Sequence, residues 1–524
     1  MYPAPLPARI WVAFYLSILA LYLLTASGRL EGSDELAMFN VTRSLVTEGS
    51  LSSDPCAPTP RSNHCVPGLD GKNYAGFGLV PSIVEMPAYA AAIPVAARLH
   101  RDTLVVAGLF ASLFHVFFAA AVPIVLALWL CRIGIPVRAA FGVAILYAVS
   151  SPAWYYSKTF CSEIYFALGL LACCYFLAGE DRNLPLLAAG ACYGLTIGSR
   201  VYGLILAPVI VIYGLMLWRS RERRPMQMAR NLTMLGIPIA ISVGLIALSN
   251  QVRFGSVLKT GYHLAFPTTA ELFSTPLLQG LKSLFFDTEV GLLIFVPWVI
   301  VVPFLWKRLW RSHPSEAILV VAMTLVNVVF FAKYNAWHGG WALEPRMLFA
   351  TIPFLAIPLA SIFDPGPQQL PRVLKASALA LIGASLLIQI ILVPYPMSRY
   401  YEMQFYNQQH GAHAWWDGQP LLEAITAAPE LFFGARSPDD SPAHQSLLTF
   451  ANRVNLVRAD FWLLKIVLLG IPKIIASATF FLLLLGLILS CCRTSSSLRA
   501  WEAEAARGQP SSPAPMVVSS DSIS

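Results

Sequence analysis

Carboxylates recur in the polar segments that separate the apolar stretches of this chain. The first such segment contains the adjacent acids Asp34 and Glu35, and the later segment YYSKTFCSE ends with Glu163. A carboxylate that reaches a hydroxyl group can act as a general base, and neighbouring carboxylates can tune each other's pKa or hold a divalent ion. These three acids are our candidate catalytic residues.

Basic, aromatic and glycine residues accompany these acids. Lys72 lies in GLDGKNYAGFG, Arg253 in NQVRFGSVLKTGYH and Arg346 in YNAWHGGWALEPR. Glycine and tryptophan beside charged residues favour a lined pocket over a solvated rim. The candidate pocket residues are Tyr74, Trp337, His338 and Trp341. A hydrogen-bonding wall residue is the alternative for the histidine, and an interfacial aromatic belt is the alternative for the tryptophans.

The elements that position these residues are expected to be membrane helices. Of the 524 residues 57% are apolar and only 12% are charged, whereas about a quarter are charged in soluble domains. Apolar stretches long enough to cross a bilayer recur from residue 10 to residue 490. The sequence predicts an all-α, polytopic membrane protein. No basic run is interleaved with aromatic residues, so we expect no nucleic-acid partner.

Twelve spans account for the apolar stretches and for the distribution of basic residues. They cover residues 10–27, 103–131, 139–156, 164–178, 184–199, 201–218, 232–249, 291–306, 316–332, 347–363, 376–394 and 462–490. Arginine and lysine concentrate in four short loops, at 131–138, 219–230, 307–313 and 372–375. The positive-inside rule places these loops and both termini in the cytoplasm. The candidate site residues then face the periplasm or exterior of a plasma (bacterial inner) membrane.

One further apolar segment, residues 79–97, is predicted to lie along the membrane interface. It contains three prolines and Glu85, and a thirteenth crossing would turn the arginine-rich loops outward. The first outer loop would then extend over residues 28–102. A true membrane span is the alternative for residues 79–97.

The expected organisation has four parts. They are a membrane catalytic module (1–394), an outer loop or small cap (395–461), a last transmembrane helix (462–490) and a disordered cytoplasmic tail (491–524). A passive tether is the alternative for the cap. Oligomeric state is not indicated by the sequence.

Two of the nine cysteines lie in a polar part of the first loop, SSDPCAPTPRSNHCVPG. A disulfide between Cys56 and Cys65 is expected if that loop faces an oxidising compartment, and two unpaired thiols are the alternative. The other cysteines lie in or beside apolar stretches and have no ligand spacing. Without an HxxEH, DxD or dense His/Asp/Glu motif, the sequence assigns no metal ligand, and a divalent cofactor stays an open question.

The order of these motifs resembles a known family. The Asp-Glu pair after the first span, the YAGFG segment with its following prolines, and YSKTFCSE before a later span are similar to polytopic glycosyltransferases of the GT-C class. Within that class the chain resembles a bacterial subgroup of the protein-mannosyltransferase and aminoarabinose-transferase branch, over roughly residues 10–400.

This resemblance implies both a fold and a reaction. The class has an α-helical membrane core whose first outer loop carries helices along the membrane. Its members transfer a sugar from a polyprenyl-phosphate carrier to a lipid, glycan or protein acceptor on the non-cytoplasmic side. The resemblance implies that Asp34 acts at the acceptor, that Glu163 is the acid of the second outer loop and that Lys72 contacts the carrier phosphate. Asn73 and Tyr74 follow this lysine, where the family usually has two prolines.

The implied reaction is an inverting displacement. Asp34 would take the proton of the acceptor hydroxyl, while cations would stabilise the phosphate that leaves. Lys72, Arg253 and Arg346 are the candidate phosphate-binding residues, because arginine grips phosphate with two hydrogen bonds and lysine supplies a point charge. An ion pair with Glu344 is the alternative for Arg346. The alternative function is a transporter or flippase of a lipid-linked glycan, although no internal repeat supports it.

Overall fold

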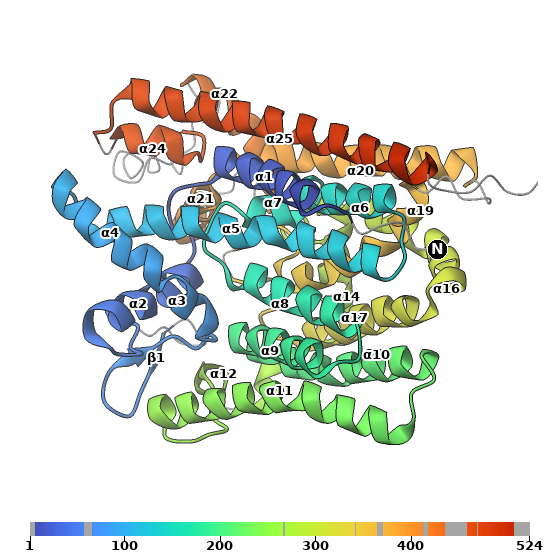
Figure 1. Cartoon of the computed structure of the whole chain (residues 1–524). Coiled ribbons are helices and arrows are strands. Elements are labelled where there is room, and N and C mark those ends of the chain that lie inside the picture. Colours follow the sequence, from blue (N-terminus) through green and yellow to red (C-terminus); the bar gives the residue numbers. More distant parts are fainter. Residues whose placement is uncertain are drawn as a thin grey trace, which may run out of the picture.

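A computed structural model describes residues 6–56, 65–265, 268–340, 342–363, 370–411, 418–434, 458–468 and 470–507. These residues are almost entirely helical (Figure 1), and the described strands form one two-stranded sheet. The predicted all-α class of a multi-pass membrane protein is confirmed. The fully buried tryptophans Trp129, Trp218 and Trp298 lie within one large core that the helices share.

Eight helices or continuous helical runs among the described residues are long and apolar enough to cross a membrane. Each overlaps one of the twelve predicted spans, but the last predicted span (462–490) is divided, because residues 462–468 form a separate helix and the candidate span begins at Lys473. Six are single helices: α1 (Ala8–Thr25), α5 (Thr103–Arg132), α11 (Pro225–Phe254), α17 (Pro314–Lys333), α20 (Arg372–Leu392) and α25 (Lys473–Arg507). One run joins η1 (Val201–Leu206) to α10 (Ala207–Ser220). The other run consists of η3 (Arg346–Thr351), α18 (Ile352–Leu355), η4 (Ile357–Leu359) and α19 (Ala360–Phe363).

The other four predicted spans are helical but shorter or broken. They correspond to α6 (Val137–Val149) with α7 (Pro152–Tyr156), α8 (Ser162–Leu177), α9 (Asn183–Ser199), and α15 (Leu292–Phe295) with η2 (Pro297–Val301) and α16 (Val302–Ser312). Pro152 and Pro297 begin new helical segments within two of them, because proline lacks the amide that would continue the preceding helix. Twelve crossings therefore stay a prediction.

The first outer loop folds into short elements that pack against α5 and α9. They are α2 (Ser33–Glu48), β1 (Val66–Pro67), β2 (Asn73–Tyr74), α3 (Val80–Val84) and α4 (Met86–Leu99). The segment 79–97 is divided at Glu85 and is not one of the eight candidate spans. A Cβ atom at Gly78 would lie 2.1 Å from the carbonyl oxygen of Gly198, so only glycine lets this loop approach the end of α9 so closely.

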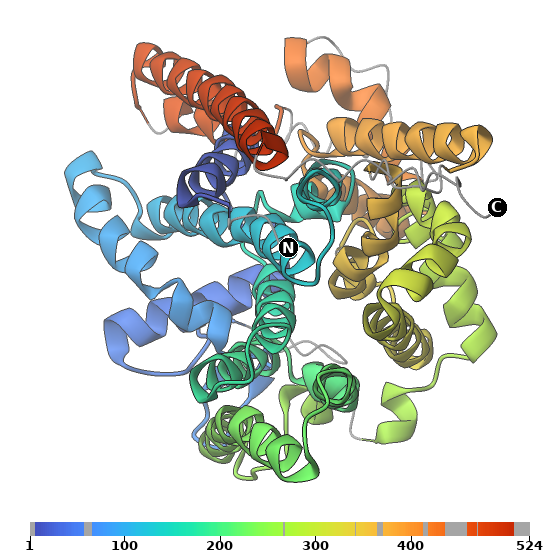
Figure 2. The ribbon, with the colours of Figure 1, turned by 45° about the vertical axis from the view of Figure 1, so that its right-hand side comes forward.

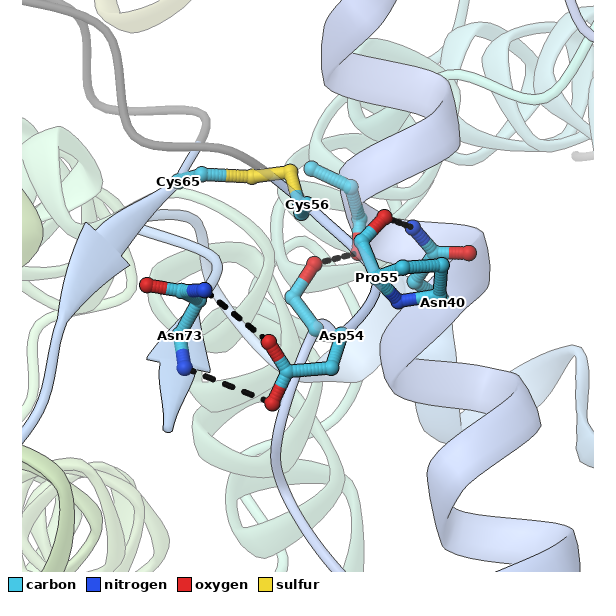
Figure 3. The surroundings of a disulfide bond; sticks show 8 residues. Asn40, Asp54, Pro55, Cys56, Cys65 and Asn73 are labelled. Carbon is cyan, nitrogen blue, oxygen red and sulfur yellow. Dashed lines mark hydrogen bonds between the residues drawn. A yellow bond between two sulfur atoms is a disulfide. The ribbon is translucent and has the colours of Figure 1, made fainter. Parts of the chain in front are cut away.

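A disulfide between Cys56 and Cys65 ties the segment after α2 to β1 (Figure 3). The two Cα atoms are 6.0 Å apart. Beside it, the side-chain amide of Asn73 donates to the carboxylate of Asp54 at 3.0 Å. These contacts fold the loop back beside the helix that carries Asp34.

Six further helices occur among the described residues. They are α12 (Gly261–Ala265), α13 (Thr269–Leu272), α14 (Leu277–Phe286), α21 (Met397–His410), α22 (Pro420–Phe433) and α24 (Trp462–Leu468). Figures 1 and 2 both show α25 side by side with α1. Residues 412–417 and 435–457 of the predicted cap lie outside the described residues.

The predicted boundary between the last span and a disordered tail at residue 491 was wrong for the first part of that tail. Helix α25 continues without interruption to Arg507. The segment SLRAWEAEAAR is rich in alanine, leucine, glutamate and arginine, which are strong helix formers. Its Glu502 forms an ion pair with Arg138 at the start of α6. Residues 508–524 lie outside the described residues.

Candidate active site

Asp34 and Arg346 are distant in the chain but adjacent in the structure. Asp34 lies in the first turn of α2, and Arg346 is the first residue of η3. Their Oδ2 and Nη1 atoms are 2.9 Å apart, and the side chains are 23% and 7% exposed. The acid is therefore the member of this pair that solvent or a ligand can reach.

Glu163 links this pair to a second arginine. Its Oε1 atom accepts from both Arg346 and Arg200, and the side chain is only 3% exposed. The Nε atom of Arg200 also donates to Ser162 at 2.8 Å. The side chains of Asp34, Arg346, Glu163 and Arg200 thus form a continuous row of alternating charge, which we call the charge row. The alternative pairing of Arg346 with Glu344 is not present, because the Glu344 carboxylate accepts from Gln389 instead.

A small pocket opens at the exposed end of the charge row. Its walls come from the start of α2, the loop after α7 and Arg346. Asp34, Glu35, Tyr156, Lys158, Cys161 and Arg346 are among its lining residues. The tyrosine hydroxyl donates to the carbonyl of Leu343 at 2.5 Å, which holds this wall against the segment that precedes η3.

Glu35 lines the same pocket but its carboxylate is engaged with the protein. The Oε2 atom accepts from the backbone amide of Glu31 at 2.8 Å and from the hydroxyl of Thr159 at 2.6 Å. Burial raises the pKa of Glu35 to about 8, and these hydrogen bonds offset only part of that effect. The side chain therefore fastens the start of α2 to the loop after α7.

Replacing Glu35 by glutamine should flatten the pH dependence of stability. The pKa is near 4.5 in the unfolded chain and about 8 in the folded protein, so the folded state binds the proton more tightly between these values. Stability from this group is complete below the lower pKa and is lost as pH rises to about 8. Thermal unfolding of the wild type and of Glu35→Gln from pH 5 to 9 measures the effect. The unfolding temperature of Glu35→Gln relative to that of the wild type should rise as the pH approaches 8. A constant difference across this range would contradict it.

A second group of buried charges adjoins the pocket. Asp460 accepts from Lys158 at 3.0 Å and from Lys465, and it forms an ion pair with Arg29 at 3.1 Å. Glu31 pairs with Arg29 at 3.2 Å and lies 3.9 Å from Lys158. We call these five residues the ion cluster; its side chains are at most 17% exposed. It joins the last outer segment to the first one.

An apolar groove of about 220 Å³ lies between the first loop, α9 and α11. Apolar side chains of all three elements form most of its walls, together with Arg253 and Tyr262. Arg253 is 5% exposed and donates to the carbonyl of Ala75 at 2.9 Å and to the side-chain oxygen of Asn250 at 3.1 Å. No carboxylate among the described residues pairs with it. Gly198 and Val201, on either side of Arg200 in the chain, line this groove, so the groove and the charge row are neighbours.

The structure does not bring Lys72 or Tyr74 into the charge row. Lys72 is exposed at the turn between β1 and β2, where its backbone amide donates to Asp70 at 3.1 Å. The Tyr74 hydroxyl donates to the same carboxylate at 2.8 Å, and its ring packs against Phe254. The two-residue strands hold this turn outside both pockets.

Of the three predicted pocket residues near Arg346, the structure describes Trp337 and His338. His338 is exposed and its ring nitrogen bonds to the amide of Gly340 at 3.1 Å, while Trp337 meets the imidazole edge-on at 5.7 Å. Trp341 lies outside the described residues. No group of three or more potential metal ligands is present among the described residues, so the structure assigns no ligand set.

Sequence reasoning missed most of the ion cluster. Arg29 and Glu31 flank the Asp-Glu motif at short range, and this proximity was the available indication for them. Asp460 and Lys465 lie at the far end of the chain, next to the last apolar stretch, with no local motif that links them to the first loop. Arg200, at the end of the apolar stretch of α9, could be recognised from the sequence as a further candidate cation, with an interface-anchoring arginine as the alternative.

No family model and no curated protein matches the chain. Among solved structures, ArnT from Cupriavidus metallidurans bound to undecaprenyl phosphate aligns at 16% identity and a TM-score of 0.45, over 95% of this chain and 77% of ArnT. An oligosaccharyltransferase from Archaeoglobus fulgidus aligns at 13% identity and a TM-score of 0.40, over 76% of this chain and 58% of that one. Both are GT-C membrane glycosyltransferases. That is the class that the sequence resembles.

Proposed function

We propose that the protein is a membrane glycosyltransferase that uses a polyprenyl-phosphate-linked sugar donor. It transfers the sugar to a lipid, glycan or protein acceptor on the non-cytoplasmic face. The observation that carries the proposal is the charge row, which presents the carboxylate of Asp34 at a pocket and lies beside an apolar groove. A carboxylate that can serve as a base for the acceptor therefore lies near cations that can bind the phosphate of a lipid donor.

Asp34 is the proposed general base. It is the exposed end of the charge row, and Arg346 fixes its orientation at 2.9 Å. The acceptor hydroxyl gives its proton to Asp34 while its oxygen attacks the anomeric carbon. The bond from that carbon to the phosphate oxygen breaks, the phosphate keeps the electron pair, and the configuration inverts. Glu163 is a positioning residue, because it contacts both arginines and is buried behind them.

Arg253 is the proposed contact for the donor phosphate. A buried guanidinium without a carboxylate partner is costly unless a bound anion compensates it, and arginine suits phosphate. The groove supplies apolar walls on which an isoprenoid chain can lie, with this cation among them. Arg200 brings a second guanidinium, paired with Glu163, to the side of the groove that Gly198 and Val201 line. The exposed position of Lys72 gives it no part in this proposal.

Replacing Arg253 by glutamine should weaken use of the donor. Loss of one charge-assisted contact to phosphate costs about 1.5–3 kcal/mol, which corresponds to roughly a 10- to 150-fold lower kcat/KM for the donor. Transfer assays with purified protein in vesicles, at varied concentrations of a synthetic polyprenyl-phosphate sugar, measure this change. Lys259→Gln is the matched control, because it removes the same charge from an exposed position in the same outer segment. Equal effects of the two variants would remove Arg253 from the phosphate site.

The same vesicles distinguish transfer from transport. A transferase releases free polyprenyl phosphate and a glycosylated acceptor in equal amounts. A flippase moves the intact lipid-linked sugar between leaflets, which a membrane-impermeant reagent detects, without releasing polyprenyl phosphate. Movement without release would contradict the proposed function and favour the transporter.

A further inference from the structure

A third cavity lies between the first and last long helices, and no residue of the charge row lines it. Helices α1 and α25 run side by side (Figures 1 and 2), and a slot of about 490 Å³ remains between them. Leucine, valine and alanine side chains line it from Val12 to Leu23 on α1 and from Leu482 to Leu489 on α25. A slot with such walls is suited to hydrocarbon chains.

The polar residues of this slot are gathered at one end. Arg9 begins the lining on α1, and Ser490 and Arg493 end it on α25. Both arginines are exposed, and neither side chain forms an ion pair or hydrogen bond within the described part of the chain. Glu502, further along α25, is already paired with Arg138. The slot therefore has apolar walls and two uncompensated positive charges at its mouth.

The dimensions and orientation of the slot match one membrane leaflet. From Val12 to Leu23, the apolar part of the lining on α1, the helix rises about 17 Å at 1.5 Å per residue, and half of the hydrocarbon core is about 15 Å thick. The positive-inside rule puts the arginine end at the cytoplasmic surface. Basic pockets between helices on that side bind anionic headgroups.

We propose that this slot binds one anionic phospholipid of the cytoplasmic leaflet, with its acyl chains between α1 and α25 and its phosphate on Arg9 and Arg493. A second copy of this chain is a less suitable occupant, because a symmetric contact here would bring the arginine pairs of two copies together. The lipid links the two ends of the chain. Helix α24, which directly precedes α25, carries Lys465 of the ion cluster, so an occupied slot supports the elements that border the proposed active site.

Native mass spectrometry of the full-length protein tests this site with two defined lipids. Phosphatidylglycerol and phosphatidylcholine of identical acyl chains are added to the detergent-solubilised protein. The wild type should retain phosphatidylglycerol about tenfold more strongly, and the double variant Arg9→Gln/Arg493→Gln should retain the two lipids equally. Arg372→Gln/Lys375→Gln is the matched control, because it removes two exposed charges from the start of α20 and should behave as the wild type.

A second variant fills the slot and leaves both arginines in place. A Cβ atom at Gly486 meets nothing within 4 Å, and leucine favours a helix over glycine, so Gly486→Leu should fold and should lose the preference for phosphatidylglycerol. Equal retention of both lipids by the wild type would overturn the proposal, as would an equal loss in the control pair. A wild-type dimer that Gly486→Leu converts to a monomer would also overturn it and assign the slot to a second copy.

Discussion

Replacing Asp34 by asparagine should lower the rate of sugar transfer by a factor of about 10²–10⁴, the usual contribution of a positioned general base. The amide keeps the size of the side chain and an oxygen that can accept from Arg346, so the fold and the donor KM should change little. Steady-state assays at saturating donor and acceptor measure the loss, which should appear in kcat.

The control for this variant is Asp102→Asn. Asp102 also belongs to the first outer loop, and its carboxylate accepts from the amide of Leu104 at 2.8 Å at the start of α5. Asparagine caps helices as well as aspartate does, so this change should leave transfer and stability unaltered. A kcat for Asp34→Asn within threefold of the wild type would exclude Asp34 as the base, and a loss shared by both variants would point to a general effect of charge.

Replacing Asp460 by asparagine should produce the largest loss of stability. The substitution leaves Arg29, Lys158 and Lys465 buried with Glu31 as the remaining acid of the ion cluster. Removing one partner of a buried ion pair costs about 3–5 kcal/mol, because the other charges stay out of water. We expect a lower unfolding temperature in detergent and a smaller yield of folded protein.

Glu180→Gln provides the comparison for Asp460→Asn. Glu180 pairs with Arg182 at 2.7 Å, but both side chains are at least 70% exposed. Surface pairs contribute within about 1 kcal/mol, so this change should leave the unfolding temperature nearly unaltered. Adding Lys465→Met to Asp460→Asn should recover part of the loss, since it removes one uncompensated charge. Equal shifts for Glu180→Gln and Asp460→Asn would show that the ion cluster contributes no more than a surface pair.

The helices could be predicted from the sequence because hydrophobic length is a local property. All eight candidate spans overlap predicted ones. The stretch at 291–306 was drawn as a single span because its composition is apolar throughout, but Pro297 begins a new segment inside it. The tail was expected to be disordered from its proline and serine content, which is concentrated beyond residue 507, whereas the preceding residues favour a helix.

The candidate site was predictable only as a set of residues on one face. Topology placed Asp34, Glu163 and Arg346 outside, and the structure brings these three into contact. The same reasoning placed Lys72 with these three residues, but the turn between β1 and β2 holds Lys72 away from the charge row. Nothing in the sequence indicates this distance. Asp460 was missed because its partner Lys158 is 302 residues away, and that pairing depends on which helices pack together.

The ion cluster also has a consequence for the order in which the protein is made. A polytopic protein enters the membrane from its N-terminus as it is synthesised, so Arg29, Glu31 and Lys158 arrive long before Asp460. Until the segment with Asp460 emerges, Arg29 and Lys158 have only Glu31 as an acidic partner within the ion cluster. The ion cluster at the pocket wall can therefore form only when nearly the whole chain has been translated, and a chain that stops before residue 460 would lack the acid that completes it.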